Sequence, residues 1–282
     1  MTKWEKIRER LYEHKFEVED KLKEAGYTEG EHYIFESISL QGSQNYGTDT
    51  ENSDVDSKYS LIPTVKSMLR GTDFTYDLTV SKNEKVSVKS FPDFVNLFFK
   101  GNVNNLEMLF TDYIVCNHNL GLIYNLRPIR EDIVKATFGT VMSAMVGMAI
   151  QKQKSMLKGT ETTKPFVEKL GYDPKDCAHI LRLNVMLRKL VGGSKFEDAL
   201  IMDDSYIRMR EAMYTGEIPL EGMQNFVNSW IASMKACEEG AKRTMFNHGG
   251  KIQKLKESVA QNYEDVYDEY LREEVYDCTY CR

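Results

Sequence analysis

The stretch Gly42-Ser43-Gln44-Asn45-Tyr46-Gly47, with Ser53-Asp54-Val55-Asp56 shortly after it, decides how the rest of this sequence is interpreted. A strand that ends in Gly-Ser lets the backbone approach a ligand closely, and the turn after it can present N–H groups and a hydroxyl to phosphate oxygens. Because residues i and i+2 of a strand point to the same face, Asp54 and Asp56 direct two carboxylates to one place while Val55 enters the core. We therefore expect a phosphate-binding turn, the Gly-Ser turn (residues 42–47), beside two acids, the carboxylate pair (Asp54 and Asp56).

The carboxylate pair suits Mg²⁺ or Mn²⁺, because hard divalent cations prefer oxygen ligands. The simpler alternative is that Asp-x-Asp arose by chance and that an aspartate at the start of a strand is only a turn residue. The order strand, Gly-Ser, loop, Asp-x-Asp, strand favours the metal site, since it places metal ligands and phosphate ligands together.

Strands are expected on both sides of this stretch. Residues 34–40 predict the first, with Ile34, Ile38 and Leu40 on one side of the sheet, and residues 55–62 predict the second, which Pro63 ends. Residues 74–80 and 85–91 flank residues 81–84 and predict a hairpin. An amphipathic helix, residues 4–22 with Trp4 in its apolar stripe, precedes the strands.

After residue 91 the apolar spacing becomes helical, and we expect only helices from there on. One buried helix is predicted over residues 134–150, and others over residues 176–190, 224–242 and 251–274. The sequence thus predicts an α/β (α+β) fold, with a small sheet and helices in residues 1–125 and an all-helical part in residues 126–282.

The composition restricts the possible partners. With 37 Lys and Arg against 43 Asp and Glu, the formal net charge is −6, which argues against broad, salt-driven binding to nucleic acid or to an anionic membrane. Residues 1–10 lack the apolar segment of a secretory signal, and residues 134–150 are too short and too mixed for a membrane span. We therefore expect a cytoplasmic protein with no membrane partner.

The five cysteines are expected to be reduced thiols, because their number is odd and their spacing uneven. Cys278 and Cys281 form a single Cys-x-x-Cys at the end of the sequence. Without a second ligand pair they cannot complete a tetrahedral zinc site, so a frayed tail is expected there.

A second group of polar residues lies on one predicted helix. Lys175, His179, Arg182 and Met186 are three or four residues apart and share one face. A Lys-His-Arg face can hold a triphosphate or a nucleic-acid backbone. The alternative is an ordinary solvated face with a hydrogen-bonded histidine.

The Gly-Ser turn and the carboxylate pair together resemble the signature of the polymerase-β superfamily, in the form found in predicted nucleotidyltransferases of bacteria and their phages. Tyr46-Gly47 is typical of that form. Two later stretches resemble the same group and extend the resemblance across most of the chain: Gly101-Asn102-Val103-Asn104-Asn105-Leu106-Glu107-Met108-Leu109-Phe110-Thr111 and Gly171-Tyr172-Asp173-Pro174-Lys175-Asp176-Cys177-Ala178-His179-Ile180-Leu181-Arg182-Leu183.

The resemblance implies a mixed sheet packed against helices, with residues 1–125 as a nucleotidyltransferase core. The carboxylate pair would be catalytic and would hold Mg²⁺ or Mn²⁺. The reaction would move a nucleoside monophosphate to a hydroxyl on RNA, protein or a small molecule, by in-line attack at the α-phosphorus with release of pyrophosphate. The expected ligands of the nucleoside triphosphate are Gly42, Ser43, Tyr46, Lys89, Lys175, His179 and Arg182.

One position departs from that resemblance. Active members place a third carboxylate on a later strand, where it serves as metal ligand and as base for the acceptor hydroxyl. Here that position falls at Ser87, on the site side of a strand whose Val86 and Val88 face the core. A serine hydroxyl supplies neither negative charge nor a base near neutral pH. Asp77 or Glu84 could substitute if the sheet brings either of them inward.

Two other functions therefore stay open. The chain could be a catalytically weak nucleotide-binding protein that acts as a sensor, sponge or regulator, because the third carboxylate is replaced by Ser87. It could also be a nucleic-acid-binding module that uses the face of Lys175, His179 and Arg182.

Overall fold

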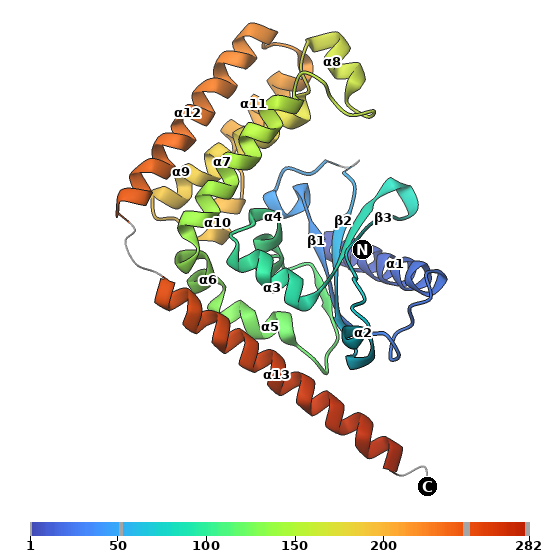
Figure 1. Ribbon diagram of the computed structural model, residues 1–282. Coiled ribbons are helices and arrows are strands. Elements are labelled where there is room, and N and C mark those ends of the chain that lie inside the picture. Colours follow the sequence, from blue (N-terminus) through green and yellow to red (C-terminus); the bar gives the residue numbers. More distant parts are fainter. Residues whose placement is uncertain (1, 51–52, 245–248, 280–282) are drawn as a thin grey trace.

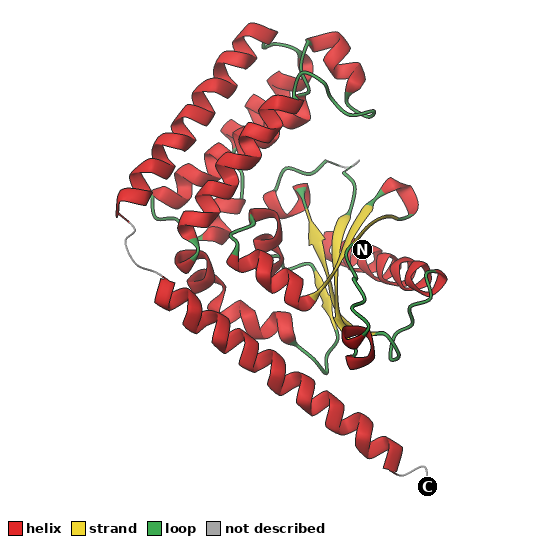
Figure 2. Ribbon diagram, in the orientation of Figure 1, coloured by secondary structure: helices red, strands yellow, loops and turns green. Residues whose placement is uncertain are grey.

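A mixed sheet forms the first part of the computed structural model, which describes residues 2–50, 53–244 and 249–279 (Figure 1). Within these ranges the sheet has five strands in the order β3-β4-β2-β1-β5, with β2 parallel to β4 and the other neighbours antiparallel. Helices build the second part, so the predicted α/β fold class, a small mixed sheet followed by a helical part, is confirmed (Figure 2). The strands are β1 (Tyr33–Gln41), β2 (Asp56–Pro63), β3 (Tyr76–Thr79), β4 (Lys85–Ser90) and β5 (Ile114–Cys116).

The helices close to the sheet come mostly from the first half of the sequence. They are α1 (Lys3–Glu24), α2 (Val65–Leu69), α3 (Phe91–Phe99), α4 (Val103–Leu106) and α5 (Leu122–Leu126), with short 3₁₀ helices η1 (Ser43–Tyr46), η2 (Ser81–Asn83), η3 (Glu107–Leu109) and η4 (Arg127–Ile129). The remaining helices are α6 (Arg130–Ala136), α7 (Phe138–Ser155), α8 (Lys164–Leu170), α9 (Pro174–Val191), α10 (Phe196–Leu200), α11 (Asp204–Thr215), α12 (Leu220–Thr244) and α13 (Gly249–Thr279).

The sheet lies between two layers of helices (Figure 1). On one face α1 packs against β1, β2 and β5, and its N-terminus is closed by a capping box between Thr2 and Glu5. On the other face α3 packs on β2 and β4, and α5 packs on β1. The predicted hairpin is confirmed, since β3 and β4 pair antiparallel and Val86 and Val88 are buried on the α1 face.

A bulge in β1 changes which side chains share a face. The pairing of β1 with β2 shifts register between Phe35 and Ser37, so an extra residue interrupts the alternation. As a result Ile38 and Leu40 pack on the α1 face, whereas Ile34 belongs to the core on the opposite face. The prediction that all three lie on one side was therefore wrong for Ile34.

Three other expectations from the sequence need correction. The strand β5 follows residue 91, where only helices were expected; it is three residues long and pairs with β1. The helix predicted over residues 134–150 is broken at Thr137, where α6 ends before α7 begins. Trp4 is 41% exposed and carries the Arg8 guanidinium over its ring instead of joining the apolar stripe of α1.

One hydrophobic cluster joins the sheet to the helical part. It extends from Ile34 and Ile62 through the buried residues of α3, α7 and α9 to Val259 of α13. Residues on both sides of position 125 thus contribute to the same core. The division into residues 1–125 and 126–282 stays a prediction.

Within the described ranges, no single helix has both the length and the apolar character needed to cross a bilayer. Judged only by length and composition, one pair bent by 76° would meet that requirement, Leu122–Ala136 with Phe138–Ser155.

Gly101 should be intolerant of any side chain. Its φ is +69°, and a Cβ there would lie 2.5 Å from the backbone nitrogen of Val141 in α7. We expect Gly101→Ala to lower the free energy of unfolding by about 2–4 kcal/mol, from a left-handed conformation and a backbone clash together. Urea denaturation measures this loss. Gly71→Ala is the matched control, because Gly71 has φ +65° with nothing near its Cβ position; equal losses in both variants would contradict the clash.

Candidate functional site

A cavity of about 510 Å³ lies where the ends of β1 and β2 face α9 and α11. It brings together the Gly-Ser turn, the carboxylate pair and the Lys-His-Arg face, three groups that are far apart in the sequence. Its lining residues are Gln41, Gly42, Ser43, Tyr46, Thr48, Thr50, Ser53, Asp54, Asp56, Asn104, Lys175, Ala178, His179, Arg182, Tyr206, Arg210 and Tyr214.

A buried acid, Glu107, forms hydrogen bonds with two residues of the Gly-Ser turn. Gly42 has φ +100° and ψ −148°, a conformation that glycine adopts readily and other residues avoid. Its N–H donates to Oε1 of Glu107 at 3.0 Å, and the Tyr46 hydroxyl donates to Oε2 of the same carboxylate. Lys58 Nζ lies 4.0 Å from Glu107 Oε1 and donates to the Asn104 carbonyl. Glu107 thus fixes both ends of the turn.

The carboxylate pair is fixed at the start of β2. Asp54 is exposed and Asp56 is half-buried. Oδ1 of Asp56 accepts a hydrogen bond of 2.9 Å from the backbone N–H of Lys85, at the start of the parallel strand β4. Between the two acids, the N–H of Val55 donates to Oε1 of Glu84 at 2.9 Å.

Glu84 belongs to a buried network behind the carboxylate pair. Its Oε2 is 2.5 Å from Arg10 Nε and 2.9 Å from His14 Nε2, and His14 Nδ1 lies 2.9 Å from Ser57 Oγ. Burial alone would raise the pKa of Glu84, but the hydrogen bonds it accepts, first among them that from Val55, outweigh burial and lower this pKa. Glu84 therefore stays charged and turned towards α1, and holds the segment between the two acids rather than extending into the cavity.

The face of α9 supplies positive charge to the cavity. Lys175, His179 and Arg182 all line it, whereas Met186, predicted on the same face, is buried in the core. The Arg182 side chain lies 3.9 Å above the Tyr46 ring, and the residue is only 6% exposed. The ion pairs formed nearby within the described residues are Lys3–Asp49, Lys58–Glu107 and Lys152–Asp176, and no described carboxylate lies within 4.0 Å of the Arg182 nitrogens.

The contribution of α11 to the cavity was not predicted from the sequence. Tyr206, Arg210 and Tyr214 line the cavity, and Arg210 Nη1 donates to the Thr48 carbonyl at 2.5 Å. The backbone N–H of Met202, just before α11, also donates to the Tyr46 carbonyl at 3.0 Å. The helical spacing of Tyr206, Arg210 and Tyr214 was a signal that could have suggested a shared face. Nothing in the nearby sequence indicates that this face lies against the Gly-Ser turn.

Three predicted site residues lie apart from the cavity. Lys89, Ser87 and Asp77 are absent from its lining; Ser87 pairs with Lys58 on one side and with Asp77 on the other, and Asp77 is exposed. Among the residues that the structure describes, no group of three or more His, Cys, Asp or Glu side chains is arranged to hold a metal ion. Cys281 and the Cys278 side chain lie outside the described residues; Cys116, Cys177 and Cys237 are free thiols.

No protein-family model and no curated protein matches this sequence. Among solved structures, the chain is similar to a nucleotidyltransferase-like protein from Exiguobacterium sibiricum 255-15, with 11% identity and a TM-score of 0.32. The similarity covers 84% of this chain and 78% of that one. Because a similarity of this size decides neither family nor activity, function must be argued from the geometry of the cavity.

A second cavity, of about 490 Å³, lies on the other side of Ser53 and Asp54. These two residues line both cavities, so Asp54 stands in the wall between them. The rest of the second cavity comes from α1 and from the connection between β3 and β4. Its further lining residues are Lys6, Glu9, Arg10, Glu13, Val55, Lys82 and Glu84.

His179 should make the protein less stable in acid. Burial, reinforced by the positive charges of Arg182, Lys152 and Lys175, lowers the pKa of His179 from 6.5 to about 3. Between these values the unfolded chain binds a proton that the folded chain does not, so the free energy of unfolding falls as the pH is lowered from 6.5.

We expect His179→Gln to remove this contribution, which for one proton has a slope of at most about 1.4 kcal/mol per pH unit. Urea denaturation at pH 7, 6 and 5 measures the slope. His118→Gln, a change at an exposed residue, is the control. A His179→Gln variant with the wild-type slope would contradict the argument.

Proposed function

We propose that this chain binds a nucleoside triphosphate in the 510 Å³ cavity and transfers its nucleoside monophosphate to a hydroxyl acceptor, with release of pyrophosphate. The phosphates lie between the Gly-Ser turn on the sheet side and Lys175, Arg182 and Arg210 on the helical side. His179, neutral at pH 7, lines the same space as a hydrogen-bonding group.

The observation that carries this proposal is the environment of Arg182. Arg182 is 6% exposed as a residue, lines the cavity and has no described carboxylate within 4.0 Å, and a largely buried charge without such a partner is costly. A phosphate group supplies that partner, and an arginine fork matches its oxygens. Lys175 and Arg210 add two further cations in the same wall.

The carboxylate pair fits one divalent cation. Two carboxylates, one of which already accepts the Lys85 N–H, are too few for two ions, but Mg²⁺ is often held by one or two carboxylates together with substrate phosphates. When bound, Mg²⁺ or Mn²⁺ would neutralise phosphate charge and lower the pKa of the attacking hydroxyl. The chain itself orients the triphosphate and keeps the two acids at one point.

The second cavity offers the acceptor a place opposite the Gly-Ser turn. At this edge of the sheet the order β1, β2, β4 puts the turn on one side of the carboxylate pair and the Glu84 end of β4 on the other. In-line transfer needs the acceptor opposite the leaving pyrophosphate. An acceptor hydroxyl of RNA, protein or a small molecule, entering beside Ser53 and Asp54, satisfies that condition.

The second candidate is a nucleotide-binding protein with little or no turnover. The observation that favours it is that, within the described residues, no third acid joins the carboxylate pair in a group that could hold a metal ion, and Ser87 stands at the expected position. Loss of a general base typically lowers the rate by about 10²- to 10⁴-fold while leaving binding intact. Nucleotide binding without transfer to any acceptor, in the same preparation, would favour this candidate over the first.

Removal of the Arg182 charge should weaken nucleotide binding. A hydrogen bond to a charged group is worth about 1.5–3 kcal/mol, so Arg182→Met should raise the Kd for ATP-Mg²⁺ or GTP-Mg²⁺ by about 10- to 100-fold in calorimetry. The matched control is Arg188→Met, on an exposed part of the same helix. If both variants bind the nucleotide with wild-type affinity, the proposal that Arg182 binds phosphate is wrong.

Transfer should depend on both acids of the carboxylate pair. We expect Asp54→Asn and Asp56→Asn each to lower the rate of labelled nucleoside monophosphate transfer by about 10²-fold or more, because each removes charge that stabilises the transition state. Asp77→Asn, at an exposed position outside both cavities, should leave the rate unchanged. Undiminished transfer by either Asp54→Asn or Asp56→Asn would exclude this mechanism.

A further inference from the structure

Glu107 is an acid that the nucleotidyl-transfer reaction does not itself require. Its side chain is 0% exposed, and it lies between the sheet and the helical part, at the start of η3. One carboxylate oxygen accepts from the Gly42 N–H and the other from the Tyr46 hydroxyl, so a single group contacts the first residue of the turn and the fourth residue beyond it. Lys58 Nζ, 4.0 Å away, supplies the opposite charge.

We propose that Glu107 is the positioning residue of the Gly-Ser turn: it sets the backbone of residues 42–46 so that Ser43 faces the phosphates, and it couples that turn to Arg182. This inference rests on the proposed function, because it takes the Gly-Ser turn as the phosphate site. Glu107 itself does not line the cavity and acts only through Gly42 and Tyr46.

The conformation of Gly42 explains why such a residue is needed. Glycine has more backbone freedom than any other residue, and at φ +100° nothing lies within 4 Å of its Cβ position to hold it by packing. The hydrogen bond to Glu107 is therefore the main restraint on its amide. Because this N–H is directed to Glu107, Gly42 does not donate to a phosphate, which leaves that task to Ser43 and the residues after it.

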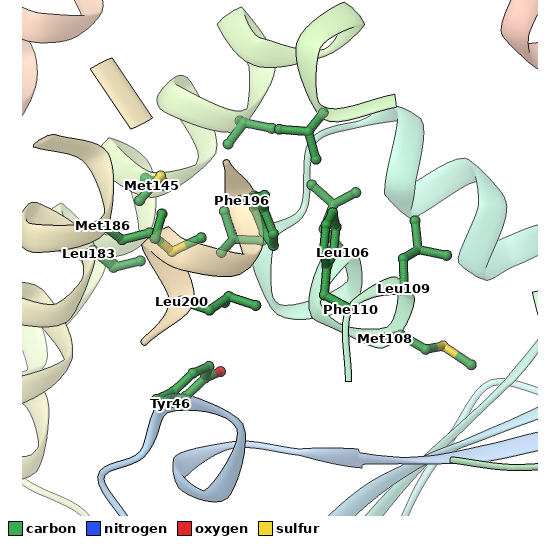
Figure 3. Packing of buried hydrophobic residues seen from close by; sticks show 14 of the residues in the cluster. Tyr46, Leu106, Met108, Leu109, Phe110, Met145, Leu183, Met186, Phe196 and Leu200 are labelled. Atoms are coloured by element: carbon green, nitrogen blue, oxygen red, sulfur yellow. The ribbon is translucent and has the colours of Figure 1, made fainter. Parts of the chain in front are cut away.

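The coupling to the helical part runs through Tyr46. Its hydroxyl contacts Glu107, and its ring lies beneath the Arg182 guanidinium. Figure 3 shows this ring at the end of the turn, between the sheet side and Leu200 of the helical part. A change at Glu107 is thus transmitted to both walls of the phosphate site, the turn directly and Arg182 through the Tyr46 ring.

The test compares Glu107→Gln with Glu36→Gln. Glutamine keeps the size of the side chain and one accepting oxygen, but its amide nitrogen cannot accept the second hydrogen bond, and the charge is lost. Glu36 is an equally buried acid on β1 that accepts the Ile123 N–H at 3.0 Å and the Ser37 hydroxyl at 2.6 Å, and it lines neither cavity near the carboxylate pair. It therefore controls for the general effect of replacing a buried glutamate with glutamine.

Two measurements are made on full-length protein, after thermal unfolding has shown that each variant is folded. The first is the Kd for inorganic triphosphate with Mg²⁺, which is expected to rise about 10-fold or more in Glu107→Gln and to stay unchanged in Glu36→Gln. The second is hydrogen exchange of the Gly42 amide without ligand, which is expected to be at least about 10-fold faster in Glu107→Gln only. Tyr46→Phe, which keeps the ring and removes one hydrogen bond, should give a smaller loss of affinity and serves if Glu107→Gln does not fold.

Each outcome either supports or overturns the inference that Glu107 positions the Gly-Ser turn. Wild-type affinity and wild-type Gly42 exchange in a folded Glu107→Gln variant would overturn the inference, and so would equal effects in Glu36→Gln. Should the wild type itself fail to bind triphosphate, the proposed function falls. In that case fast Gly42 exchange in Glu107→Gln alone still shows that Glu107 restrains the turn, and unchanged exchange shows that it does not.

Discussion

The site depends on a carboxylate that water does not reach. Leaving the Glu107 charge buried and unpaired would be costly, so its two oxygens must be satisfied by groups brought from elsewhere in the chain. Those groups are the Gly42 amide after β1, the Tyr46 hydroxyl four positions further into the Gly-Ser turn, and Lys58 on β2. Burial lowers the pKa of Lys58 to about 8, and the nearby Glu107 carboxylate opposes that shift. The Glu107 side chain thus holds the end of β1, the Gly-Ser turn and β2 in fixed positions relative to one another.

Because the turn is fixed on the sheet side, the helical part can complete the cavity. Arg182 rests on Tyr46, Arg210 holds the Thr48 carbonyl, and the Met202 amide holds the Tyr46 carbonyl. Behind the carboxylate pair, Glu84 accepts a hydrogen bond from the Val55 N–H, as Glu107 accepts one from the Gly42 N–H. Each buried acid thus restrains one backbone amide at the site. The ligand-facing residues can therefore remain exposed and polar while their backbone is anchored in the core.

Local pattern was enough to predict much of this arrangement. The positions of strands β1 and β2, the shared face of Lys175, His179 and Arg182 on α9, and the order of Gly-Ser and Asp-x-Asp were predicted from short-range signals and are present in the fold. Features that depend on pairing between distant segments were missed: β5 is too short for its own periodicity, and the bulge near Glu36 moved Ile34 to the other face. The partnership of Glu107 with Gly42 and Lys58 is equally invisible, because nothing in the local sequence marks that acid as buried. Glu107 lies within residues 101–111, a stretch noted in the sequence only for its resemblance to the family.

The charged residues around the cavity favour the binding of a nucleotide more than they favour the transfer reaction. Lys175, Arg182 and Arg210 face the carboxylate pair across the cavity, an excess of positive charge that a triphosphate carrying one divalent ion would neutralise. In the proposed reaction the acceptor hydroxyl must also lose a proton. Among the described residues, Asp54 and Asp56 are the acids that line the first cavity, and Glu9, Glu13 and Glu84 line the second with Asp54. Ser87 cannot replace a base; it pairs with Lys58 on β2 and with Asp77 on β3, and Asp77 is exposed and lines neither cavity. If Asp54 and Asp56 bind the metal they are poor bases, and Glu84 is engaged by Val55, Arg10 and His14, so proton removal from the acceptor is the step that the carboxylate pair and Glu84 support least.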